Sequence, residues 1–178
     1  MANTHTLLQT VTTTSNQASV TLGSGGTISQ LYTDLKIIAS LRSVGGTAAA
    51  DQLRMTFNGS GSNYKDTAIY GDGGAVSTFK QTSNSWGFPG GVQSAPTTAN
   101  IFTAGEIYIP NYVTSKYKSW SGNFATENNA TQAFFYLAGG LWVDNSAITS
   151  ITFTVDPGNS ATGFATNSTF YLYGISNA

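Results

Sequence analysis

Apolar and polar residues alternate along most of the chain, whereas the i, i+3, i+4 spacing of an amphipathic helix is nearly absent. Short runs rich in Thr, Val, Ile, Phe and Tyr are separated by clusters of Gly, Asn, Ser and Asp, which is the spacing of a β-sandwich or barrel. The pattern predicts about ten strands and no helix. We place strands at residues 6–14, 17–22, 34–42, 52–57, 64–70, 75–80, 106–109, 117–125, 131–142, 147–155 and 169–175.

Short turn sequences join several of these strands. Gly-Asp-Gly-Gly at 71–74 separates two alternating runs, and these residues tolerate the positive φ angles that tight β-turns need. Asn58-Gly59 ends the strand at 52–57. Ser15-Asn16 stands between the first two strands and predicts a hairpin there. The sequence therefore predicts an all-β fold of antiparallel strands.

Two segments depart from the regular alternation. Residues 81–100 form the longest stretch without a clear period, and they hold Trp86, Phe88 and Pro89. A connection of this length in a compact domain is usually functional or interfacial. The run at 131–142 is apolar on both sides, which predicts a strand in the middle of its sheet. Gly139-Gly140 within this run indicates a bulge or the close approach of another backbone.

Charge is scarce in this chain: 8% of the residues are charged, against about 25% in an ordinary soluble domain. Thr, Ser, Asn and Gly together supply 80 of the 178 residues. Because 40% of the residues are hydrophobic and the net charge is only −1, the chain can form a core and disorder is not expected. The length predicts a single domain over 1–178, to which we assign a short N-terminal arm at 1–6.

The same composition argues against two classes of partner. Nucleic-acid binding needs clustered Lys and Arg, whereas the basic residues here are scattered. No apolar run approaches the roughly 18 residues of a transmembrane helix. The first residues also lack the basic and apolar regions of a signal peptide. We therefore expect neither a nucleic-acid nor a membrane partner.

Few residues could support catalysis or hold a metal. The chain has no Cys, and His5 is its only histidine, which argues against thiol chemistry and a Ser-His-Asp triad unless the N-terminal arm reaches a cleft. Glu106 and Glu127 are the only carboxylates that we would pair as in a glycosidase, although ordinary solvent-facing acids explain them too. Asp72 lacks the companion oxygen ligands of a calcium loop. We predict no enzyme, no catalytic residue, no cofactor and no metal.

Aromatic residues are better candidates for binding. Trp86, Phe88 and Trp120 could anchor a protein interface or stack on sugar rings. Trp86 and Phe88 lie in the unpatterned stretch, where a local core and a subunit contact explain them equally well. We take His5, Trp86, Phe88 and Trp120 as possible interface residues.

An ordered series of short segments extends over almost the whole chain. It comprises Leu7-Leu8-Gln9-Thr10-Val11, Leu31-Tyr32-Thr33-Asp34-Leu35, Leu41-Arg42-Ser43, Met55-Thr56-Phe57-Asn58-Gly59, Asn63-Tyr64, Ile69-Tyr70-Gly71-Asp72-Gly73, Glu106-Ile107-Tyr108-Ile109-Pro110-Asn111-Tyr112, Glu127-Asn128-Asn129-Ala130, Gly140-Leu141-Trp142, Ala147-Ile148-Thr149-Ser150-Ile151-Thr152 and Phe170-Tyr171-Leu172-Tyr173-Gly174-Ile175. In this order the segments resemble a widespread family of small structural proteins of tailed bacteriophages that end in such a Leu-Tyr-Gly-Ile strand.

The resemblance implies a virion component with a jelly-roll-like β-sandwich, commonly a homotrimer. Its place would be on the capsid, as a decoration or cement protein that contacts the major capsid protein, or in a fibre or the tail. We therefore expect a capsid decoration protein that stabilises the phage head by bridging capsid subunits. The alternative is a carbohydrate-binding fibre tip that recognises a host surface glycan through aromatic faces such as Trp86 and Trp120.

Overall fold

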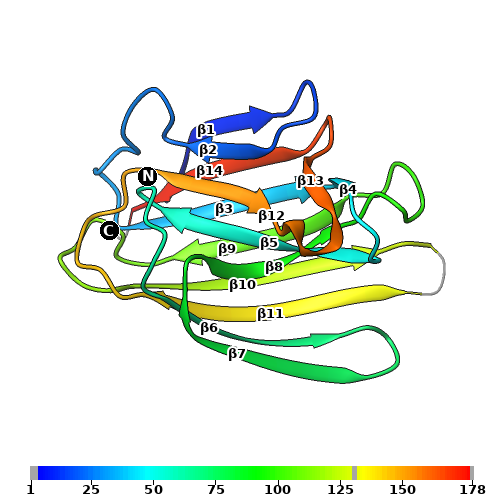
Figure 1. Cartoon of the computed structure of the whole chain (residues 1–178). Coiled ribbons are helices and arrows are strands. Elements are labelled where there is room, and N and C mark those ends of the chain that lie inside the picture. Colours follow the sequence, from blue (N-terminus) through cyan, green and yellow to red (C-terminus); the bar gives the residue numbers. More distant parts are fainter. Residues whose placement is uncertain (1–3, 130–131, 177–178) are drawn as a thin grey trace.

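The computed structural model describes residues 4–129 and 132–176, and these form three antiparallel sheets (Figure 1). The eight-stranded sheet contains, in spatial order, β1 (His5–Thr12), β14 (Thr169–Ile175), β3 (Asp34–Leu41), β9 (Thr103–Ile109), β10 (Lys118–Glu127), β11 (Ala133–Trp142), β6 (Tyr64–Gly71) and β7 (Val76–Asn84). The four-stranded sheet contains β2 (Ser19–Leu22), β12 (Ile151–Val155), β5 (Ala50–Phe57) and β8 (Gly87–Gln93). A small third sheet pairs β13 (Ala161–Phe164) with β4 (Ser43–Gly45), and a 3₁₀ turn (Pro157–Asn159) precedes β13.

The strand order is that of a jelly roll. Eight strands, β1, β2, β3, β5, β8, β9, β12 and β14, pair from the outside inward: the first with the last, the second with the seventh, and so on to β5 with β8. These pairs alternate between the two large sheets, as when one long hairpin is folded over into a sandwich. The hairpins β6–β7 and β10–β11 are additions that widen only the eight-stranded sheet. The predicted all-β, jelly-roll-like antiparallel sandwich is confirmed.

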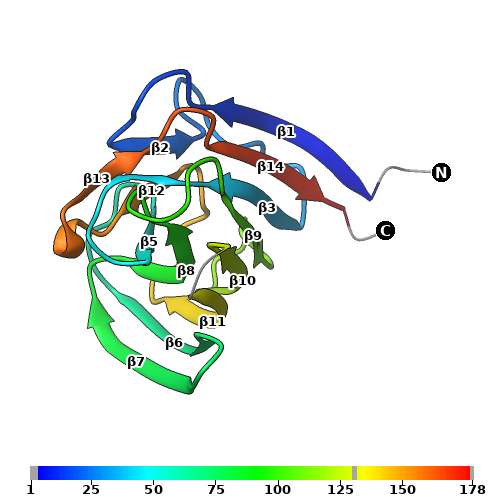
Figure 2. The ribbon, with the colours of Figure 1, turned by 90° about the vertical axis from the view of Figure 1, so that its right-hand side faces the viewer.

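The core lies between the two large sheets, which Figure 2 shows nearly end-on. Along most strands every second residue points inward, as in β10, where buried and exposed residues alternate along all ten positions. Four aromatic rings form the centre of one half of this core: Phe57, Tyr64, Trp120 and Trp142. Near β7 the wide sheet bends toward β8, and the rings of Phe79 and Phe88 meet there at 4.8 Å between centroids.

The glycine-rich strand β8 is buried at every one of its seven positions. Its glycines let large rings of the opposite sheet approach the backbone: a Cβ at Gly90 would lie 2.4 Å from the Phe124 ring, and one at Gly87 would lie 2.5 Å from the Trp120 ring. The prediction that 81–100 is a long functional connection is therefore wrong, because much of it belongs to β7 and β8. Glycine has no side chain that could be apolar or polar, so the alternation pattern could not predict β8.

The hairpin predicted at Ser15-Asn16 is also wrong. β1 pairs with β14 in the wide sheet, whereas β2 pairs with β12 in the narrow one, so this connection crosses between sheets. The predicted N-terminal arm is strand in part, because His5 and Thr6 pair with Ile175 and Gly174; residues 1–3 lie outside the described residues. The other two turns are confirmed: β6 and β7 form a hairpin around 71–74, and Asn58 and Gly59 both have positive φ.

Candidate binding face

The outer face of the eight-stranded sheet carries most of the exposed apolar surface. The described residues include nine large hydrophobic side chains that are exposed, and seven of them belong to outward positions of this sheet: Leu7, Ile38, Ile69, Val76, Phe135, Leu137 and Tyr171. Ile38, Ile69, Phe135 and Leu137 lie in mid-strand, and each leaves 40–47% of its surface in solvent. A sheet face with this many exposed aliphatic and aromatic groups marks an interaction surface.

The strand registers place these side chains side by side. One lateral row crosses seven strands, from β14 to β7: Tyr171, Ile38, Glu106, Asn123, Leu137, Ile69 and Thr78. Phe135 lies in the next row, opposite Ala125 on one side and Gly71 on the other. Residues that face each other across strands have Cβ atoms about 5 Å apart. The apolar residues on β11 and β6 therefore form one continuous ridge.

A shallow groove runs beside this ridge, along β9 and β10. Its floor consists of small outward side chains of β10, among them Ser121, Asn123 and Ala125. One hollow of about 410 Å³ lies between Tyr108 and Leu137. A second, of about 620 Å³, lies at the far end of the groove and is lined mainly by apolar groups such as Phe102, Phe134 and Phe135. The groove is thus polar along its middle and apolar at one end.

The polar groups on one wall of the groove are held in place. Lys36 Nζ lies 2.9 Å from a carboxylate oxygen of Glu106 on the neighbouring strand. The Tyr108 hydroxyl donates a 2.6 Å hydrogen bond to Asp34 Oδ2, and this bond raises the pKa of Tyr108. Asp34 also accepts a 2.8 Å hydrogen bond from the backbone N–H of Asn111. This wall is therefore pre-organised before any partner binds.

Charge is distributed unevenly along the strands of this face. Three exposed lysines, Lys65, Lys80 and Lys116, lie toward the end where β10 and β6 begin. Two acids, the half-buried Asp72 and the exposed Glu127, lie at the opposite end, where β10 ends and β6 turns into β7. The ends of the face therefore differ in sign.

Two further ionisable groups lie near the basic end. Lys118 is fully buried, and its ammonium donates to the backbone carbonyls of Thr114 and Lys116. Burial lowers the pKa of Lys118. Hydrogen bonds from Ser146 lower the pKa of Asp144, and the charge of Lys118 adds a little to this effect. Asp144 therefore reduces the positive charge at this end.

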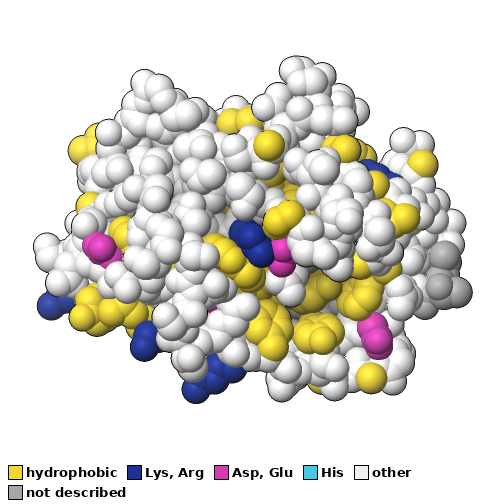
Figure 3. Space-filling model, viewed as in Figure 1, with side chains coloured by type: hydrophobic (Ala, Val, Ile, Leu, Met, Phe, Trp, Pro, Cys, Tyr) yellow, Lys and Arg dark blue, Asp and Glu magenta, His cyan; other side chains and the backbone are white. Residues whose placement is uncertain are grey.

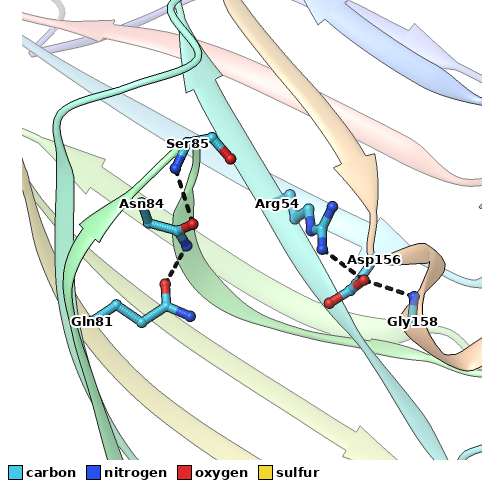
Figure 4. A network of polar contacts seen from close by, with 6 residues as sticks. All are labelled: Arg54, Gln81, Asn84, Ser85, Asp156 and Gly158. Carbon is cyan, nitrogen blue, oxygen red and sulfur yellow. Dashed lines mark hydrogen bonds and ion pairs between the residues drawn. The ribbon is translucent and has the colours of Figure 1, made fainter.

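The opposite side of the molecule, formed by the four-stranded sheet, is mostly neutral and polar (Figure 3). Its outward residues include Thr21, Thr56 and Thr152, which face each other across three strands. Arg54 is the charged residue among them, and it lies 2.7 Å from Asp156 Oδ1, which also accepts a hydrogen bond from Gly158 N (Figure 4).

The residues that we predicted as interface anchors do not form one site. His5 is exposed at the start of β1, and its ring lies 3.4 Å from the Thr4 hydroxyl. Trp86 is half-buried, and the Arg54 guanidinium lies over its ring at 4.5 Å. Phe88 and Trp120 are only 1% and 3% exposed. As exposed anchors these last two were wrong. The Trp120 ring fills the space that Gly87 and Gly140 leave between the sheets, and the Phe88 ring packs against Phe79 and Tyr136.

The geometry gives no support to glycoside hydrolysis by Glu106 and Glu127. Glu106 faces Asn123 on the neighbouring strand, and Glu127 lies four residues farther along that strand. At 3.4 Å per residue the two positions are about 14 Å apart, beyond the 5–9.5 Å at which glycosidase carboxylates work. Asp72 caps its own turn by accepting from Gly74 N and Ala75 N, which lowers its pKa. Residues 4–129 and 132–176 contain no group of three His, Cys, Asp or Glu that could hold a metal ion.

Sequence reasoning missed the residues that matter most on this face: Ile38, Ile69, Phe135 and Leu137. The available signal was the run at 131–142, which is apolar on both sides. We predicted a strand in the middle of its sheet, which is confirmed because β11 lies between β10 and β6. However, only its Tyr136 side packs inside. The other side points into solvent.

Comparison with models of known protein families found no match, and a comparison with curated proteins found none either. Within the described residues, no helix is long and apolar enough to cross a membrane. The resemblance to phage structural proteins therefore stays a prediction that rests on the sequence segments themselves.

Proposed function

We propose that this protein is a virion structural protein, a capsid decoration protein that stabilises a phage head by bridging capsid subunits. The observation that carries the proposal is the apolar outer face of the eight-stranded sheet, since a face of this kind fits a protein that works within an assembly. The scarcity of charge agrees with it, because charged residues are depleted in the cores of protein interfaces.

To stabilise a shell, each self-associated unit of the protein must contact more than one capsid subunit. A decoration protein strengthens a shell when a self-associated unit, such as the trimer that the resemblance implies, holds two or more capsid subunits at once. The second contact then forms at high effective concentration, so modest interfaces add up to firm attachment. An interface of standard size buries about 1,600 Å² in total.

Imaging of particles tests this proposal. Heads assembled with and without the protein are compared by cryo-electron microscopy, and then heated in parallel. We expect added density on the shell and a higher temperature of DNA release from the decorated heads. Density on the tail alone, or no bound protein, would contradict a decoration role.

The second candidate function is carbohydrate binding at a fibre tip. The polar middle of the groove favours it, because Ser121 and Asn123 lie beside the fixed ring of Tyr108, and sugar sites combine such groups. Glycan-array binding that is lost in Tyr108→Ala supports this function. If the protein binds no glycan on the array, the carbohydrate-binding function is refuted.

A further inference from the structure

We propose that the outer face of the eight-stranded sheet is a contact between two copies of this chain, related by a two-fold axis that lies in the interface and runs across the strands. The occupant of the face is thus a second copy of the same face. This inference goes beyond the decoration role and does not depend on it.

The kind of surface points to another sheet as its partner. Exposed aliphatic groups in the middle of a sheet are ordinarily covered by a second sheet about 10 Å away, with side chains from the two faces interdigitated. Sugar rings would be matched by exposed aromatic faces, whereas the ridge here is largely aliphatic, with Ile69 and Leu137 at its centre. The chemistry of the ridge therefore favours a protein face.

The charges select the orientation of the second copy. A two-fold axis across the strands reverses the strand direction, so the basic end of each copy lies over the acidic end of the other. Lys65 then approaches Asp72 of the second copy along β6, and Lys116 approaches its Glu127 along β10, at both ends of the contact. An axis along the strands would instead place lysines over lysines. Only the first arrangement is electrostatically complementary.

The rows of side chains allow the two faces to approach. Gly139 follows Leu137 on the outward side of β11, in the row next to it. An axis between these two rows places Leu137 of each copy over Gly139 of the other, where no side chain stands in the way. A Cβ built at Gly139 meets only the Trp120 carbonyl oxygen, at 3.8 Å, so the space above this glycine is open.

The size of the face is sufficient for a stable contact. The five strands from β3 to β6 span about 24 Å across, and positions 119–127 of β10 span about 27 Å along the strands. The flat projection is therefore about 650 Å², and the accessible area of a ridged surface is larger. Interfaces of standard size bury about 800 Å² per partner.

Sedimentation velocity on the full chain at micromolar concentrations tests the proposal. We expect a species of twice the 18.6 kDa of one chain. Leu137→Asp should weaken self-association by about 30-fold or more, because it places a charge at the centre of the contact. The matched control is Gln52→Asp, which adds the same charge at an exposed position of β5 on the opposite side of the molecule. The control should leave the dimer intact.

Two further variants keep the test decisive if Leu137→Asp fails to fold. Gly139→Gln fills the proposed recess without altering the core and should give a monomer. Reversal of one end, Lys116→Glu, should weaken the dimer about tenfold, and the added reversal Glu127→Lys should restore it. A parent protein that is monomeric or trimeric overturns the proposal, and so does a dimer that Gly139→Gln leaves unchanged. A dimer that never binds phage heads supports it while refuting the decoration role, and a monomer that binds heads does the reverse.

Discussion

Asp66 lies on β6 with its carboxylate directed into the core, and the side chain is only 4% exposed. Neither carboxylate oxygen makes a hydrogen bond of normal geometry. Burial raises the pKa of Asp66 from 3.8 to about 6, and the backbone N–H of Phe88 opposes this only in part. The folded protein therefore holds this carboxyl in its neutral form over a pH range in which the unfolded chain has already lost the proton.

The sign of the effect follows from linkage. Between pH 3.8 and about 6 the folded state binds more protons than the unfolded state, so stability falls as the pH rises through this window. Well below pH 3.8 the carboxyl is neutral in both states, so its titration does not change the free energy of unfolding. Above this window the full cost of an ionised, buried carboxylate applies, with an upper limit of about 3 kcal/mol at 1.36 kcal/mol per pKa unit. Between pH 4.5 and 7.5 the change is about 2 kcal/mol at most.

Asp66→Asn removes this titration while keeping the shape of the side chain. We expect the parent to lose about 1–2 kcal/mol relative to the variant on going from pH 4.5 to 7.5, since some relaxation around β6, next to the edge strand, reduces the cost. Urea unfolding followed by tryptophan fluorescence at both pH values measures the difference. Asp72→Asn is the control: the pKa of Asp72 is lowered, so its contribution is lost as the pH falls, the opposite direction. Equal pH dependence in parent and Asp66→Asn would refute this reasoning.

Four other substitutions, one of them a control, test the packing and the hydrogen bonds. Gly140→Ala should lower the free energy of unfolding by about 1–3 kcal/mol, because the added Cβ would lie 1.9 Å from a buried indole ring; Gly139→Ala, one residue away, should change it by less than about 0.5 kcal/mol. Arg42→Lys should speed hydrogen exchange in the loop after β8, where the guanidinium bonds four backbone carbonyls that an ammonium cannot reach together. Tyr64→Phe should cost about 1–3 kcal/mol in thermal unfolding, because its hydroxyl accepts the buried Phe57 N–H at 2.7 Å.

Strands were predictable where side chains mark the period. Leu53, Met55 and Phe57 point inward as their alternation predicts, and all three are fully buried. β8 escaped prediction because four of its seven residues are Gly or Pro, which carry no periodic signal. The short strands β4 and β13 were also missed, since three or four residues give too few alternations to count.

The candidate binding face was less predictable than the fold. Alternation distinguishes the two sides of a strand, but when both sides are apolar it does not say which side another layer covers. On β11 the inward side packs against the core through Tyr136, and the outward side leaves Leu137 in solvent. The carboxylates Glu106 and Glu127 are on neighbouring strands as expected, yet only the register shows that they lie too far apart to act together.

The sequence by itself determined that the chain is all-β, where most strands begin and end, and that little charge would be available at its surface. These properties depend on neighbours within a few residues, because backbone alternation and turn chemistry are local. Only the tertiary structure decided that β1 pairs with β14, that Phe88 and Trp120 are core, and that seven apolar side chains share one face. Such facts depend on contacts between distant segments, whose pairing is set by the packing of whole sheets and not by any one strand.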